Sequence, residues 1–380
     1  MGIEDGLSRA GAPRGFALFA LGFRPMYLLA GLYAALGVPI WAAQYAGWLP
    51  GADALWHAHE MLFGYTFAVI AGFLLTAVRN WTGLLTPSGR ALAAVAGLWI
   101  AARLSALVSL PLAPLFDAAF AAAVAWGIGR PILASRNRNW FFVLLVLALG
   151  AASGAFLAWP RLALSAGLDL VLFIIAVMAG RVIPGFTNNA IPGAGARRNQ
   201  PLEHAALGTL LVLLVADLLQ LAQAAAVIAL GAAALHAVRA ALWAPFRTTG
   251  KPILWILHLS YAWVVVHLLL RGFAGFDLVN PLLATHALTV GAIGGLTLGM
   301  MTRTARGHTA RPLEAGRAEV AAYVLVHAAA AVRVLLPLAF PLAYRESVIA
   351  SALLWGAAFA IFCIAFYPIL SRPRLDGREG

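Results

Sequence analysis

The stretch from residue 56 to residue 82 combines metal-binding side chains with a long apolar run. Its first turn carries His57, His59 and Glu60, followed by Met61. Imidazole nitrogen suits copper, iron or zinc, and thioether sulfur suits Cu(I). The rest of the stretch is long enough to span a bilayer, which takes about 20 apolar residues. Since ionisable groups beside hydrocarbon are costly and usually functional, this stretch is a candidate metal site.

Helix geometry sets a condition on that site. His57 and His59 are two residues apart, so on a regular helix they point about 200° away from each other. By the same geometry, His57, Glu60 and Met61 share a face. The two imidazoles converge only if the helix begins irregularly there. The alternative is that both are interfacial residues that reach lipid headgroups, as aromatic side chains do at that depth.

Composition identifies the class of protein. The chain has 380 residues, of which 63% are hydrophobic and 11% are charged, whereas soluble domains carry roughly 25% charged residues. Its mean hydropathy is +0.89. These values predict a multi-pass membrane protein, in which the net charge of +12 reports orientation and not binding to nucleic acid. The single cysteine, Cys363, excludes a disulfide framework within the chain.

The elements that must position these side chains are apolar helices. Twelve apolar segments are predicted, at about 16–44, 55–78, 90–109, 112–133, 139–159, 162–184, 203–222, 224–243, 252–271, 281–302, 317–338 and 347–370. We therefore expect an all-α, polytopic transmembrane bundle that forms a single domain over residues 1–380. Its cytoplasmic tails are expected at about 1–15 and 371–380.

The basic residues predict the orientation of this bundle. Most of the 26 Lys and Arg residues lie near the termini and at every second junction between segments. The alternate junctions hold only Arg161, Arg271 and Arg345. Because cytoplasmic loops are enriched in Lys and Arg, both termini are predicted to be cytoplasmic. Localisation in a bacterial cytoplasmic (inner) membrane is expected.

Several histidines are predicted at one level near the outer face. His57 and His59 begin the second segment, His267 lies near the outer end of the ninth, and His286 lies a few residues into the tenth. His327 lies nearer mid-membrane. We predict that His57, His59 and His286 bind copper or a second haem, with His267 or His327 as a further ligand.

A second level of histidines is predicted nearer the cytoplasm. His236 and His258 lie about seven residues from the cytoplasmic ends of two consecutive segments, so they face each other at matching depth on a hairpin. Facing histidines on adjacent helices commonly hold a b-type haem from both sides. The alternative is that each is a buried histidine bonded to a carbonyl or hydroxyl group.

Intramembrane acids have two possible roles. Glu60, Asp169 and Asp217 lie at similar depth near the outer face and are candidates to pass protons to a buried site, with Glu60 as the catalytic group. The competing interpretation is that the acids pair with Arg103 and Arg333.

Six sequence blocks occur in an order typical of one family. They are LGFRPMYLLAG, WHAHEMLFGYTFAVIAGFLLTAVRNWTG, MAGRVIPGFTNNA, ILHLSYAW, HALTVGAIGGLTLGMMTR and GHTARPL. With these blocks the chain resembles the NnrS family of bacterial membrane proteins across essentially its whole length. The last block departs at Ala310, where the family usually has glycine.

The resemblance implies haem and copper as cofactors and a role in handling nitric oxide and nitrosative stress. By resemblance, the histidines in family motifs are His57, His59, His258, His286 and His308. Nitric oxide is then a ligand, or a substrate of a haem-copper oxidoreductase whose electron donor stays open. The alternative from a different class is a cofactor-free transporter in which histidines and carboxylates relay protons.

Overall fold

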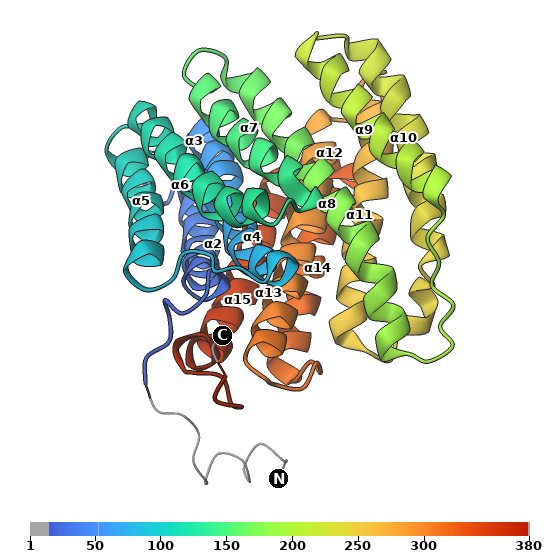
Figure 1. The fold of residues 1–380 in the computed structure, drawn as a ribbon. Coiled ribbons are helices and arrows are strands. Elements are labelled where there is room, and N and C mark those ends of the chain that lie inside the picture. The colour runs from blue at the N-terminus through green and yellow to red at the C-terminus, as the bar shows by residue number, and fades with distance from the viewer. Residues whose placement is uncertain (1–14, 52, 379–380) are drawn as a thin grey trace.

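The chain folds as a bundle of helices (Figure 1). The computed structural model describes residues 15–51 and 53–378. It is 81% helical and contains no strand in those ranges. Twelve helices in the described chain are long and apolar enough to cross a membrane. The all-α prediction and the predicted number of spans are confirmed.

The observed spans follow the predicted apolar segments closely. They are α2 (Phe23–Tyr45), α3 to α4 (Ala54–Thr82), α5 (Gly89–Val108), η2 and α6 (Leu110–Ala134), η3 and α7 (Arg138–Ala155), α8 (Pro160–Ala190), α9 (Gln200–Leu218), α10 (Ala222–Leu242), α11 (Pro252–Ala274), α12 to α13 (Pro281–His308), α14 (Arg317–Ala339), and η6 and α15 (Pro341–Ser371).

The first span begins later than predicted. Helix α2 starts at Phe23, whose backbone N–H donates to Thr76 Oγ1 at 2.9 Å on α4. Pro25 lies in the first turn, where a missing N–H costs no helical hydrogen bond. Gly22 is packed so closely on α4 that a Cβ atom there would lie 2.4 Å from Leu75 Cβ. This contact, and not the start of the apolar run, fixes where the helix begins.

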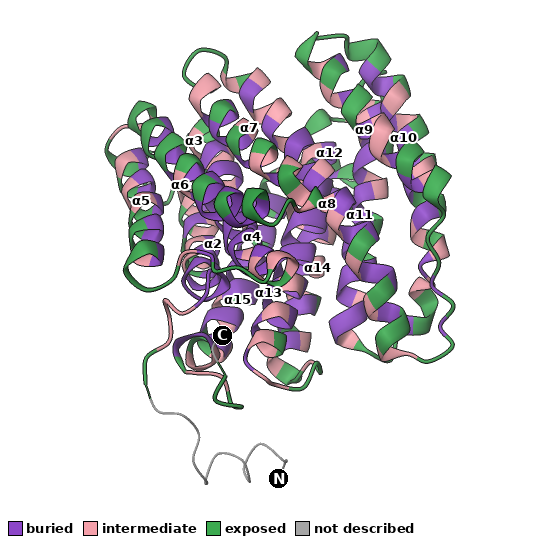
Figure 2. Cartoon of the chain, viewed as in Figure 1, coloured by how far each residue is buried: buried purple, intermediate pink, exposed green. Residues whose placement is uncertain are grey.

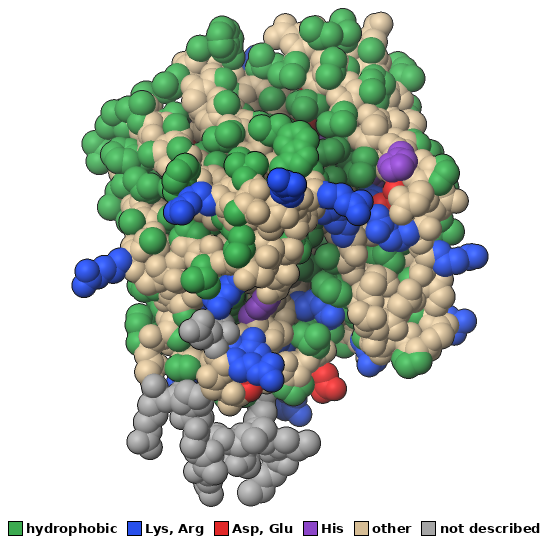
Figure 3. Space-filling view, in the orientation of Figure 1, with side chains coloured by type: hydrophobic (Ala, Val, Ile, Leu, Met, Phe, Trp, Pro, Cys, Tyr) green, Lys and Arg blue, Asp and Glu red, His purple; other side chains and the backbone are tan. Residues whose placement is uncertain are grey.

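Consecutive helices pack side by side, and the last helix closes the bundle against the first. α15 contacts both α14 and α2. The backbone N–H of Ala17 donates to the carbonyl of Ser371 at 2.8 Å. Both described chain ends therefore lie at the same end of the bundle (Figure 1). That end is basic: Lys and Arg side chains gather mainly in the lower part of the face in Figure 3. Which side of a membrane it faces stays a prediction.

Two spans form the centre of the bundle (Figure 2). In their most apolar stretches 83% of Ala54–Thr82 and 72% of Pro281–His308 is buried, against 28% for the peripheral Gln200–Leu218. Each central span contains a π-helix that begins immediately after a histidine. The segment η1 (Glu60–Thr66) follows His59, and η5 (Ala287–Gly294) follows His286. Since π segments are rare and frequent at functional sites, these two mark the region to inspect.

Candidate functional site

A cavity of about 870 Å³ opens at the end of the bundle opposite the chain termini. Its mouth is formed by residues at helix ends, among them Tyr45, Arg161 and Tyr344. Its walls converge on Ile293 and Trp355 in the interior. The volume lies in the range of about 300–1,000 Å³ usual for ligand and cofactor pockets. The cavity is therefore large enough for a cofactor-sized molecule.

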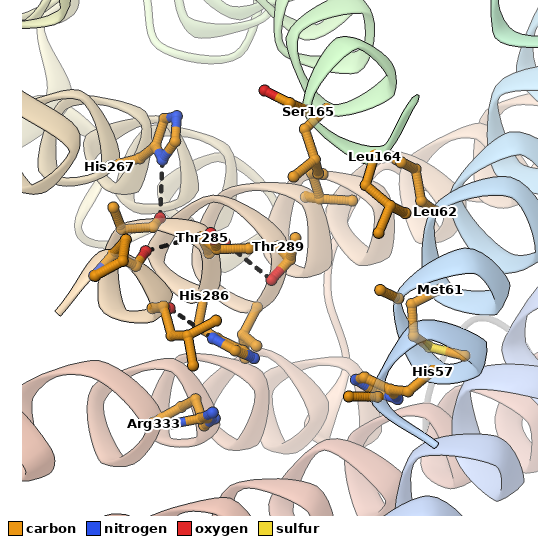
Figure 4. A pocket seen from close by; sticks show the side chains of 18 of the residues that line it. His57, Met61, Leu62, Leu164, Ser165, His267, Thr285, His286, Thr289 and Arg333 are labelled. Atoms are coloured by element: carbon orange, nitrogen blue, oxygen red, sulfur yellow. Dashed lines mark hydrogen bonds between the residues drawn. The ribbon is translucent and has the colours of Figure 1, made fainter. Parts of the chain in front are cut away.

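Three of the predicted histidines line this cavity: His57, His267 and His286 (Figure 4). The Nδ1–H of His267 donates to the carbonyl of Ala284 at 2.8 Å, and its Nε2 is buried without a hydrogen-bond partner. The Nδ1–H of His286 donates to the carbonyl of Leu282 at 2.6 Å. A carbonyl that accepts from one ring nitrogen leaves the other with a free lone pair, as in metal-binding histidines. The Nε2 atoms of both are available as ligands.

His57 approaches from the opposite wall. Its ring stacks on Trp41 with 4.0 Å between centroids and 20° between planes. Its Nδ1 is buried without a partner. Met61 lies one turn further along and lines the same cavity (Figure 4). This wall thus offers an imidazole and a thioether.

Three arginines line the cavity: Arg161, Arg271 and Arg333. Arg271 forms ion pairs with Asp169 at 2.6 Å and with Asp217. The suggested pairing of these two acids with Arg333 was wrong: their partner is Arg271, because α8, α9 and α11 bring the three side chains together. Arg333 instead donates from Nη2 to Tyr344 Oη at 2.8 Å.

His59 and Glu60 lie outside this cavity, in a closed polar cluster. Glu60 accepts from Arg103 Nη1 at 2.6 Å, from His59 Nδ1 at 2.9 Å and from the hydroxyl of Tyr33. Arg103 also pairs with Asp117. We call Tyr33, His59, Glu60, Arg103, Asp117 and Ser153 the closed cluster.

Hydrogen bonds link the members of the closed cluster to one another. Ser153 donates its hydroxyl proton to Asp117 Oδ2 at 2.9 Å, and its oxygen lies 3.2 Å from His59 Nε2. Because Nδ1 of His59 faces the Glu60 carboxylate, both ring nitrogens have polar partners inside the cluster.

The expectation that Glu60 shares a face with His57 and Met61 was wrong for Glu60. On a helix Glu60 lies about 60° to one side of His57 and Met61 about 40° to the other. The cavity lies on the Met61 side, and the closed cluster lies on the other side. Among the described residues, no group of three or more His, Cys, Asp or Glu side chains is arranged to hold a metal ion.

The remaining predicted site residues lie elsewhere. His327 Nε2 is 3.4 Å from Ser260 Oγ, and its Nδ1 is buried without a partner. His236 has both nitrogens engaged, Nδ1 with Tyr261 Oη at 2.5 Å and Nε2 with the carbonyl of Ala206 at 3.1 Å. His258 Nε2 lies 2.9 Å from Thr187 Oγ1 on α8. The structure therefore ties His236 and His258 to different helices.

Sequence reasoning missed a buried pair beside His236. Arg239 donates to Glu203 from Nε at 2.8 Å and from Nη2 at 2.6 Å, and to Tyr261 Oη at 2.7 Å. A Cβ atom on Gly180 would lie 2.0 Å from Arg239 Nη2, so this position needs a glycine. The signal was present in the spacing, since Arg239 lies three residues after His236 and shares its helix face.

The comparison with protein families agrees with this architecture. The family model described as NnrS protein matches residues 17–374, which is nearly the whole chain. No curated protein matches the sequence. The match spans both central helices, the cavity and the closed cluster. The chain belongs to the NnrS family.

Proposed function

We propose that this protein is a haem-binding protein of a bacterial inner membrane whose outer cavity holds the haem. Membership of the NnrS family makes it a membrane protein related to the nitric oxide response. The observation that carries the haem proposal is the state of His267 and His286. Each donates Nδ1–H to a carbonyl, so Nε2 keeps its lone pair, and each residue lines a large cavity.

The residues present fit a haem. Imidazole nitrogen is the commonest protein ligand of haem iron. The walls include broad apolar side chains such as Trp41, Val290 and Trp355, against which a flat macrocycle packs. His267 or His286 would ligate the iron. When bound, the haem supplies a metal centre that binds nitric oxide.

Copper fits less well. His57 and Met61 offer the nitrogen and sulfur that suit Cu(I), and His286 lines the same cavity. His59 belongs to the closed cluster, and His327 lies beside Ser260. We therefore narrow the copper proposal to His57, Met61 and His286.

The chain's own residues determine what reaches the cavity. Its apolar walls limit water, and nitric oxide, which is small and uncharged, enters through the bilayer. The role proposed for Glu60 is indirect, since its carboxylate belongs to the closed cluster. Turnover requires protons from this cluster or from the mouth. Glu60→Gln protein that retains haem, followed with a nitric oxide electrode, separates an enzyme from a binding protein.

Haem content of purified variants tests the proposal. The pyridine haemochrome assay, with copper measured on the same sample, should show haem in the wild type and less than about a tenth as much in the double variant His267→Ala/His286→Ala. The matched control is His236→Ala/His258→Ala, which also removes two imidazoles from membrane-spanning helices and should keep its haem. Loss of haem only from the control variant would assign the haem to His236 and His258. A colourless wild type would favour the transporter alternative.

Orientation is tested separately. We propose that the basic end is cytoplasmic, because most Lys and Arg residues lie there. Reporter fusions at Asp277 should then report the periplasm and fusions at Arg311 the cytoplasm. A periplasmic signal at Arg311 would contradict the proposed topology and place the cavity mouth on the cytoplasmic side.

A further inference from the structure

Arg333 is a buried cation without an anion. Its side chain is 5% exposed. Within the described part of the chain, no carboxylate lies within ion-pair distance of its guanidinium, and Nη1 is buried without a hydrogen-bond partner. Its partners are the hydroxyl and the ring of Tyr344, with 4.6 Å from Cζ to the ring centroid. The guanidinium lines the cavity beside His286 (Figure 4).

This state differs from that of two other arginines near the outer end. Arg103 is matched by Glu60 and Asp117, and Arg271 by Asp169 and Asp217. Arginine stays protonated in proteins, and a buried charge with no counter-charge is strongly unfavourable. Inside a membrane-spanning bundle, such a residue marks a candidate binding site.

We infer that Arg333 binds a carboxylate or similar oxyanion of the molecule that occupies the cavity. Tyr344 holds one edge of the guanidinium by accepting from Nη2, so Nη1 keeps its free N–H for the ligand. Arginine is well suited to such a ligand because its planar donors match the geometry of a carboxylate.

Two sources offer this chemistry. One is a propionate side chain of a bound porphyrin, in which case the inference deepens the proposed function and rests on it. The other is a free small anion that enters by the mouth. The inference concerns charge at Arg333, and the proposed function concerns metal ligation at His267 and His286. The two therefore fail independently.

Binding of charged and uncharged probes tests the inference. Purified full-length protein from haem-starved cells is titrated with haemin and with haemin dimethyl ester, and quenching of tryptophan fluorescence is followed, since Trp41 and Trp355 line the cavity. The Arg333→Met variant lacks a charged hydrogen-bond donor, so it should bind haemin about tenfold or more weakly than the wild type. The ester, which lacks the charges, should bind both proteins equally. Arg161→Met removes the same charge at the mouth and should change haemin affinity less than about threefold.

A second probe identifies the source. Acetate and nitrite are added to the wild type and to Arg333→Met, and protection against thermal unfolding is measured. If acetate or nitrite protects only the wild type against thermal unfolding, and haemin binds no better than its ester, the ligand of Arg333 is a free anion. If, in addition, neither porphyrin binds, the proposed function is overturned and this inference stands. Equal binding of haemin and ester, with no anion effect, overturns this inference and keeps the haem. If Arg333→Met does not fold, Tyr344→Phe should weaken haemin binding in the same direction by a few-fold.

Discussion

His57 and His59 are separated by one residue, and they lie in opposite surroundings. His57 lines a cavity, stacks on Trp41 and leaves Nδ1 without a partner. His59 is completely buried, and both of its nitrogens contact polar groups of the closed cluster. The helix period separates the two rings, as the spacing predicts. One turn of helix therefore supplies both an open site and a closed polar core.

The same contrast separates Arg103 from Arg333. Arg103 is matched by two carboxylates contributed by α6 and by the start of the second span, although its Nε is buried without a hydrogen-bond partner. Arg333 has a tyrosine and an unfilled donor. A charge-balanced buried network makes the structure rigid and specific, whereas a buried charge without a counter-charge is a cost unless a ligand offsets it. The comparison teaches that buried charge stabilises the bundle on one side of the second span and is available for binding on the other.

The largest difference is expected from removing each arginine. Arg103→Met leaves Glu60 and Asp117 buried without their main counter-charge and should lower the free energy of unfolding by about 3–5 kcal/mol. Arg333→Met removes an unpaired charge, so unliganded protein should be unchanged or more stable. Denaturant unfolding in mixed micelles, followed by helical circular dichroism, measures both. Equal losses in the two variants would contradict the distinction between the regions.

A smaller difference is expected from the two histidines. His59→Ala deletes a completely buried ring and leaves Glu60 and Ser153 without its hydrogen bonds, which should cost about 3 kcal/mol. His57→Ala enlarges an existing cavity and should cost less than about 1 kcal/mol. Metal content should respond in the reverse order, with copper lost from His57→Ala and kept in folded His59→Ala. Copper loss in both variants would indicate that both histidines contribute to one metal site.

Hydroxyl groups allow a finer comparison. Tyr33→Phe removes a donor to the Glu60 carboxylate and should destabilise the protein by about 1.5 kcal/mol, since hydrogen bonds to charged groups contribute about that much. Tyr344→Phe removes an acceptor from a guanidinium near the mouth and should cost under about 0.5 kcal/mol without ligand. The same unfolding measurement applies. A larger loss at Tyr344 would mean that the mouth is structurally important.

The fold was predictable because membranes impose strong rules. Apolar run length predicted twelve spans, and the structure places spans at matching positions. Site geometry was less predictable, because depth does not determine direction. His267 and His286 were predicted at one level and do line one cavity, while His236 and His258 were predicted to face each other and instead bond to Tyr261 and Thr187.

Rotation around each helix is the missing variable. The apolar residues surround most spans, so no polar face shows which side is buried in protein. Glu60 illustrates this, because the rotation of its helix places the carboxylate against Arg103 and not in the cavity. Packing between distant segments made that choice, and one sequence does not encode it in a readable period.

The smallest predicted effect tests whether losses in the two regions are local. Ala310 has a φ of +59°, in the left-handed region that disfavours L-residues other than glycine. Ala310→Gly should therefore stabilise the protein by about 1 kcal/mol. Ala305→Gly, within α13, is the matched control and should destabilise it by a similar amount.

Position 310 lies just beyond the end of α13, and His286 lies near the start of the same span, so the two are about 33 Å apart along the helix axis at 1.5 Å per residue. Substitutions that far apart should add. Ala310→Gly should then raise the free energy of unfolding equally in the wild type, in Tyr33→Phe and in Arg333→Met. If the gain disappears only with Tyr33→Phe, the closed cluster is coupled to the basic end through the central helices. It would then be part of a larger cooperative unit than its contacts indicate.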